Sequence, residues 1–219
     1  MLTKLALKEL HETAWIVAAA LAVYLYLTMS MIGLNIGPWV AFGRGYNIPF
    51  LAEEFVGLFA MVAACLAIAL GFRQTVGESA KGTFLFLLHR PAAREQLIGT
   101  KLLVGLGLYL ICSAIPIAIY AGWAATPGTH ASPFEWSMTI PIWKVWITMP
   151  ILYLGAFLSG LRPARWYGSR LFPLATCGGA AFFFALMPWW GIVGLVAVVG
   201  LAALLVAQIL YVARTRDFS

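Results

Sequence analysis

Six apolar runs dominate this chain of 219 residues and restrict the folds open to it. They cover residues 14–35, 55–72, 102–123, 141–161, 171–187 and 191–213. A helix needs about 20 residues to cross the hydrocarbon core of a bilayer, and each run reaches or approaches that length. An open strand cannot satisfy its backbone polar groups in lipid, so the runs are predicted to be helices. We expect an all-α integral membrane protein with six transmembrane helices in a single transmembrane domain, 1–219.

Composition excludes an ordinary water-soluble domain. Charged residues make up 10% of the chain and hydrophobic residues 63%, whereas soluble domains carry about 25% charged residues. The net charge of +6 is compatible with nucleic-acid binding, but the basic residues form no stripe with interleaved aromatic side chains. They lie at the ends of the apolar runs instead. We therefore expect a lipid bilayer around the chain and no nucleic-acid partner.

The distribution of basic residues predicts the orientation of the spans. All Lys and Arg residues except Arg44 and Lys144 fall in segments that six spans would place on one side. Loops rich in Lys and Arg stay in the cytoplasm. The expected protein is therefore a multi-pass protein of the cell membrane, plasma or inner, with its N- and C-termini in the cytoplasm.

Two segments allow alternatives. Over residues 1–13, most charged side chains share one helical face, which predicts a helix lying in the membrane interface. Glu9 is out of place in that pattern, and the alternative is a simple extension of the first span. The fifth run is short and is interrupted by Gly178-Gly179, so it is either a full span or part of a re-entrant hairpin with the sixth.

The spans carry few groups that suggest chemistry. Lys144 lies near the start of the fourth run and is expected to extend to the outer interface, the alternative being contact with a substrate. Ser159-Gly160 is reminiscent of the nucleophile of a six-span intramembrane protease, but no histidine lies within a span to act as its base. Close packing of helices is the more ordinary use of such small residues.

No cofactor or metal site is expected. Cys65, Cys112 and Cys177 are far apart within apolar runs, and we expect them to be small core residues. No phosphate-binding G-x-x-x-x-G-K-[ST] motif occurs. The chain is therefore expected not to be an enzyme, and any ATP that it depends on would be hydrolysed by another subunit.

The longest charged segment lies between the second and third runs, from Gly77 to Lys101. Within it, the apolar stretch 83–88 is too short to cross a bilayer. On the cytoplasmic side, such a stretch is either a docking surface for a partner or an anchor in the bilayer interface. Pro91 suits the first turn of a helix and Glu95 favours the helix dipole there, so we expect a helix that continues into the third span.

This segment resembles the cytoplasmic loop in the membrane subunits of ATP-binding-cassette transporters of the type-2 exporter class. Those permeases have six spans with both termini inside, and the loop joins their second and third spans. It commonly carries a Glu, a Gly-Thr, a Leu-rich run, then Pro-x-x-Arg and a later Lys. The matching positions here are Glu78, Gly82-Thr83, 85–88, Pro91, Arg94 and Lys101.

The resemblance implies a permease subunit that moves a substrate across the membrane, in the direction of export. It implies two copies of a separate P-loop ATPase, and a second permease subunit, identical or different. It also implies a coupling helix in the loop, with an ATPase interface formed by Glu78, Lys81, Thr83, Phe84, Leu87, Leu88, Arg90, Pro91 and Arg94. Opposite charge and family position suggest an ion pair between Glu78 and Arg94.

Two other functions are compatible with the sequence. The first is a scaffold or assembly subunit of a membrane complex that transports nothing. The second is an intramembrane enzyme, for which Ser159 is the candidate nucleophile. A gene for a P-loop ATPase next to the gene for this chain would favour the transporter.

The orientation can be tested by labelling introduced cysteines in intact cells. Cysteines at Thr129 and Asn47 should react with a membrane-impermeant reagent added from outside, whereas cysteines at Ser169 and Ser219 should react only after the cells are opened. Labelling of Ser169→Cys from outside would overturn the predicted topology.

Overall fold

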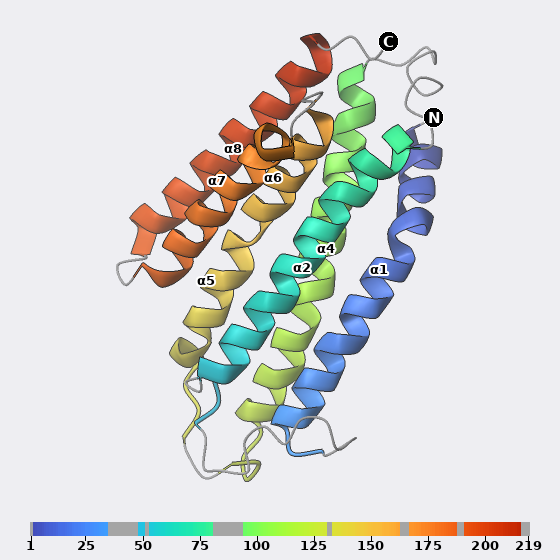
Figure 1. Ribbon diagram of the computed structural model, residues 1–219. Coiled ribbons are helices and arrows are strands. Elements are labelled where there is room, and N and C mark those ends of the chain that lie inside the picture. Colours follow the sequence, from blue (N-terminus) through green and yellow to red (C-terminus); the bar gives the residue numbers. More distant parts are fainter. Residues whose placement is uncertain are drawn as a thin grey trace.

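The helices of the computed structural model lie roughly along one direction and form an elongated bundle (Figure 1). The structure describes residues 2–34, 48–50, 53–80, 94–130, 133–162, 167–187 and 191–215. In chain order the elements are α1 Leu2–Met31, α2 Glu53–Ala80, α4 Arg94–Ala125, the 3-10 helix η1 Trp136–Thr139, α5 Ile140–Thr148, α6 Pro150–Leu161, α7 Tyr167–Leu186 and α8 Gly191–Thr215. No strand occurs within these ranges.

Six of these helical segments are long and apolar enough to cross a membrane, which confirms the predicted number of candidate spans. They are Thr3–Met31, Glu54–Gly77, Arg94–Ala125, Trp136–Leu161, Tyr167–Leu186 and Gly191–Thr215. The fourth is built from η1, α5 and α6 in succession. The chain is therefore compatible with a multi-pass membrane protein.

The N-terminal segment is part of the first helix. Instead of a separate helix over 1–13, α1 is unbroken from Leu2 to Met31, which matches the alternative of an extended first span. Leu5, Glu9 and Thr13 are buried at helical spacing, so this part of α1 packs on the bundle with one face. The helix ends at Met31, and Gly33, two residues later, has a φ of 91°, which suits the left-handed residue that commonly follows a helix end.

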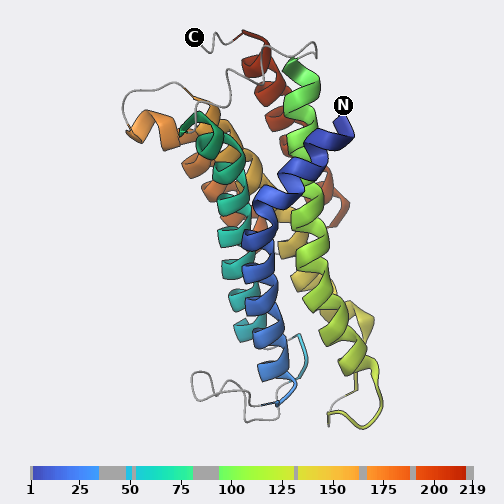
Figure 2. The same ribbon diagram turned by 90° about the vertical axis from the view of Figure 1, so that its right-hand side faces the viewer.

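The fourth span contains the most buried helix of the bundle. All residues of α6 are buried. In the most apolar stretch of this span 78% of the residues are buried, whereas the corresponding share is 17% in the fifth and sixth spans. In Figure 1, α6 lies between the pair α7 and α8 on one side and α2 and α4 on the other. Figure 2 shows α1 lying across α2 and α4 on the far side of the bundle from that pair.

Small residues let the neighbours of α6 approach it closely. A methyl group added at Gly71 of α2 would lie 2.7 Å from Ala156 Cβ and 2.8 Å from the carbonyl oxygen of Tyr153. A methyl group added at Gly155 of α6 would lie 2.6 Å from Cys177 Cβ of α7. Glycine is needed at these positions because any side chain would push the two helices apart.

A proline divides the fourth span. α5 ends at Thr148 and α6 begins at Pro150, which has no backbone N–H to donate. Met149 between them keeps helical dihedral angles, with φ −64° and ψ −24°. Pro116, by contrast, does not divide its helix, and α4 continues through it without a break.

The fifth span is one continuous helix. α7 passes through Gly178-Gly179 and contains 20 residues, a length that reaches about 30 Å at 1.5 Å per residue. Its length and composition favour a full span over a re-entrant segment. In Figure 1, α7 and α8 lie on the same side of α6, and each of them contacts α6.

The close approach of α2 to α6 can be tested with matched glycine substitutions. Gly71→Ala should lower the free energy of unfolding by about 1–3 kcal/mol, because the added methyl group overlaps α6. Gly107→Ala is the control, since the space around Gly107 of α4 is open. Alanine favours a helix over glycine, so the control should be neutral or stabilising. Equal stability of the two variants, measured by thermal unfolding in detergent, would contradict the close contact.

Candidate functional site

The predicted coupling segment joins two helix ends at one end of the bundle. Glu78 belongs to the last turn of α2, and Arg94 is the first residue of α4 and is exposed. The first turn of α1 and the last turn of α8 are at the same end of the bundle, and the start of α4 lies beside the end of α8 in Figures 1 and 2. The other predicted interface residues lie outside the described residues: Lys81, Thr83, Phe84, Leu87, Leu88, Arg90 and Pro91.

The helix expected after Pro91 is confirmed from Arg94 onward, because α4 begins there and continues through the third span. Glu95 lies in its first turn, as expected. The side chain of Glu78 is outside the described part, so its pairing with Arg94 stays a prediction.

A buried ion pair joins α1 to α4 about two turns inside this end of the bundle. Lys101 Nζ lies 2.9 Å from Glu9 Oε1, and the two side chains are 3% and 2% exposed. The partners are 92 positions apart in the chain. Away from water, opposite charges attract more strongly, while an unpaired charge becomes costly. The pair therefore holds the start of α1 against α4, and neither partner can be removed alone without leaving a buried charge.

Gln74 of α2 and Tyr153 of α6 extend this pair across the bundle. The Gln74 side-chain amide donates a hydrogen bond to the Lys101 carbonyl at 3.1 Å. The Tyr153 hydroxyl donates to Gln74 Oε1 at 2.7 Å. We call Glu9, Gln74, Lys101 and Tyr153 the buried polar cluster. It connects four helices, α1, α2, α4 and α6, through hydrogen bonds and one ion pair.

A glycine makes room for this cluster. A methyl group at Gly105 of α4 would collide with the Tyr153 hydroxyl and lie 2.5 Å from Gln74 Oε1. Gly105 lies one helical turn after Lys101, on the same face of α4. The absence of a side chain there lets Tyr153 reach Gln74 past the backbone of α4.

A second, exposed ion pair lies at the same end. Arg214 of α8 binds Glu95 of α4, with 2.5 Å between Arg214 Nε and Glu95 Oε1. A further hydrogen bond of 2.7 Å joins Arg214 Nη2 to Glu95 Oε2, so the contact is bidentate. The side chains are 63% and 39% exposed, and solvent and salt weaken exposed pairs. This pair orients the end of α8 against α4 more than it stabilises the fold.

At the other end of the fourth span, Lys144 interacts with the backbone of α7. Its Nζ donates a hydrogen bond to the carbonyl oxygen of Met187, directly after the last residue of α7. A cation is favourable at a helix C-terminus, where carbonyl groups lack partners. The contact gives Lys144 a structural use, tying α5 to α7.

Ser159 also has a structural use. Its side chain is fully buried, and its Oγ accepts a hydrogen bond from the backbone N–H of Leu174 at 3.1 Å. It thereby ties α6 to α7, as expected for a small residue in close helix packing.

The three cysteines differ in their burial. Cys112 and Cys177 are buried, as expected, but Cys65 is exposed, so the prediction of a core position was wrong for it. It faces outward from α2, where a thiol behaves as a small apolar group. Within the described ranges, no three His, Cys, Asp or Glu side chains are grouped to hold a metal ion.

No family model, curated protein or solved structure matches this chain.

Sequence reasoning did not identify the buried polar cluster. Lys101 belonged to the recognised loop segment, but Glu9, Gln74 and Tyr153 had no assigned role. The available signal was Glu9, the one charge that departs from the polar face of residues 1–13. A carboxylate on the buried side of a helix requires a cation, and Lys101 is the cation that the fold supplies.

The ion pair can be tested by removing one partner or both. Glu9→Leu or Lys101→Met alone should lower the free energy of unfolding by about 3–5 kcal/mol, because each leaves a buried charge unpaired. The double variant should recover most of that loss, because no charge then remains. Unfolding titrated with a denaturing detergent measures all three variants.

The matched control is the i,i+4 pair of Lys8 and Glu12 on the same helix. Their charged groups are 3.6 Å apart and their side chains are 38% and 31% exposed. Lys8→Met should cost at most about 1 kcal/mol. Similar losses for Lys8→Met and Lys101→Met would contradict the special position of the buried pair.

Proposed function

We propose that this chain is the permease subunit of an ATP-binding-cassette transporter of the type-2 exporter class. It works with a second permease subunit and with two copies of a separate P-loop ATPase. The residue order from Glu78 to Lys101 supports this proposal, together with the six helices that are long and apolar enough to cross a membrane.

The observation that carries the proposal furthest is the place of the buried polar cluster. Gln74 lies about two turns before the end of α2, and Lys101 about two turns after the start of α4. These two helices enter and leave the segment that resembles the coupling loop. The cluster joins them to each other and to α1 and α6.

Such an arrangement suits the transmission of force. A push on the loop moves α2 and α4, and Gln74 and Lys101 move with them. Through the Glu9 ion pair the movement reaches α1, and through the Tyr153 hydrogen bond it reaches the buried helix α6. Tightly packed elements pass on displacements because their interiors are not compressible. In this proposal, closure of the ATPase dimer moves these four helices together.

The proposal is tested by placing charges on the apolar stretch of the loop. The double variant Phe84→Asp/Leu87→Asp should insert in the membrane normally. A P-loop ATPase should co-purify with the tagged wild-type chain from its native host, and the variant should lose it together with transport. The reason is that an unpaired charge is costly to desolvate in an apolar contact.

The matched control is Tyr167→Asp/Gly168→Asp at the exposed start of α7. It adds the same charges at the same end of the bundle and should keep the ATPase. A Phe84→Asp/Leu87→Asp variant that is well expressed and retains its ATPase would contradict the proposed coupling role of this stretch. Loss of expression, without selective loss of the ATPase, would indicate an anchor in the bilayer instead.

A further inference from the structure

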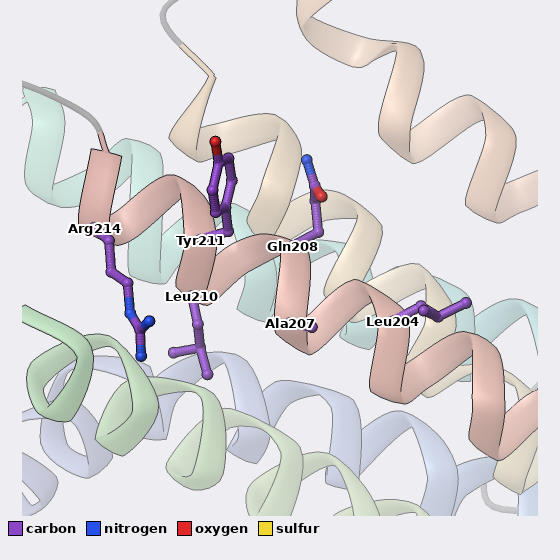
Figure 3. A pocket seen from close by; sticks show the side chains of 6 residues that line it. All are labelled: Leu204, Ala207, Gln208, Leu210, Tyr211 and Arg214. Carbon is purple, nitrogen blue, oxygen red and sulfur yellow. The ribbon is translucent and has the colours of Figure 1, made fainter.

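A groove of about 530 Å³ follows the exposed face of α8 near the end of the chain. Figure 3 shows the six side chains that line it in the described part of the chain: Leu204, Ala207, Gln208, Leu210, Tyr211 and Arg214. They span about 15 Å along the helix axis. Leu204 and Ala207 line the part of the groove nearer the middle of the span, and Arg214 lines the part at the helix end.

Two polar side chains in this groove have no hydrogen-bond partner among the described residues. Gln208 and Tyr211 are both exposed, and Tyr211 keeps 62% of its surface accessible. Figure 3 shows them side by side, pointing away from the helix axis in the same direction. Polar groups on the lipid-facing side of a span are unfavourable unless a partner satisfies them. A lipid headgroup can supply acceptors for the amide and the hydroxyl.

Arg214 supplies the charge of the groove. Glu95 engages its Nε and one terminal nitrogen. A guanidinium carries five N–H donors, so donors remain on the other terminal nitrogen while the ion pair is intact. With 63% of the side chain exposed, these donors are accessible to a second anion.

We propose that this groove binds one anionic phospholipid from the leaflet at this end of the bundle, the predicted cytoplasmic leaflet. The phosphate accepts hydrogen bonds from Arg214. The Gln208 amide and the Tyr211 hydroxyl point to the other side of α8 in Figure 3 and donate to the ester oxygens, and an acyl chain lies along Leu204 and Ala207. The order of apolar, polar and cationic groups along α8 matches the order of acyl chain, ester and phosphate in such a lipid.

A second copy of the chain fits this groove less well. In a dimer with its two-fold axis along the membrane normal, residues at the same depth in the two copies lie on the shared interface. The same surface of each copy then faces its partner. Each copy would then present another Arg214–Glu95 ion pair, which brings no free anion for the remaining Arg214 donors. An anionic headgroup supplies that acceptor.

The test is native mass spectrometry of the full chain in detergent. Phosphatidylglycerol and phosphatidylcholine with identical acyl chains are added in equal amounts. The wild type should retain one phosphatidylglycerol with a preference of about fivefold, the effect of one basic residue near an anionic lipid. Arg214→Gln should remove the preference, and Gln208→Leu/Tyr211→Phe should shorten retention of both lipids.

Glu95→Gln distinguishes a lipid site from a purely structural ion pair. It frees the whole guanidinium, so retention of phosphatidylglycerol should rise. A fall to the level of Arg214→Gln would overturn the proposal. Arg170→Gln, at the start of α7 at the same end of the bundle, is the control and should leave the preference unchanged.

Two further outcomes would also overturn the site. One is equal retention of the two lipids by the wild type. The other is a change from dimer to monomer in the groove variants with no change in lipid retention, which would identify the groove as a contact between copies. The proposal is independent of the transport function, because it depends only on α8 being a membrane span.

Discussion

Close contact between helices is the constraint on which this bundle depends. In a bilayer, apolar side chains gain nothing by leaving lipid for one another, so helices associate through van der Waals contact and polar interactions. α6 meets that demand by presenting small residues to two neighbours, Gly155 to α7 and Ala156 to α2. Its complete burial follows, and the other helices take their places around it.

The buried polar cluster meets the same demand in a different way. An ion pair and hydrogen bonds between helices replace contact area where α1 and α4 cross the end of the bundle. These interactions depend on geometry, so they fix the depth of each helix relative to the others more sharply than apolar contact does. The two devices meet at Tyr153, which packs in the core of α6 and also donates a hydrogen bond to Gln74.

The sequence was sufficient to predict six helices, because a run of apolar residues of bilayer length has few other uses. It was less informative at the helix ends. Hydropathy does not detect the last turns of α2 up to Ala80, where polar residues such as Gln74 continue the helix. For residues 2–13, a helical wheel separates polar from apolar faces. It does not tell a face in contact with lipid from a face in contact with protein.

The pairing of Glu9 with Lys101 was beyond the reach of sequence patterns for another reason. Patterns within a helix report neighbours three or four positions apart, whereas these partners meet only once α1 and α4 lie side by side. Lys144 shows a related limit: its place near one end of a span was evident, but its acceptor, the Met187 carbonyl directly after α7, is 43 positions along the chain.

The distance between Glu9 and Lys101 along the chain also has a consequence for biosynthesis. A ribosome completes the first helix well before it adds Lys101, 92 positions later. During that interval the Glu9 carboxylate lacks the Lys101 cation that pairs with it in the bundle. An unpaired carboxylate is more stable among lipid headgroups and water than in an apolar interior. The start of α1 is therefore made before α4 but takes its final position only when α4 supplies the counterion.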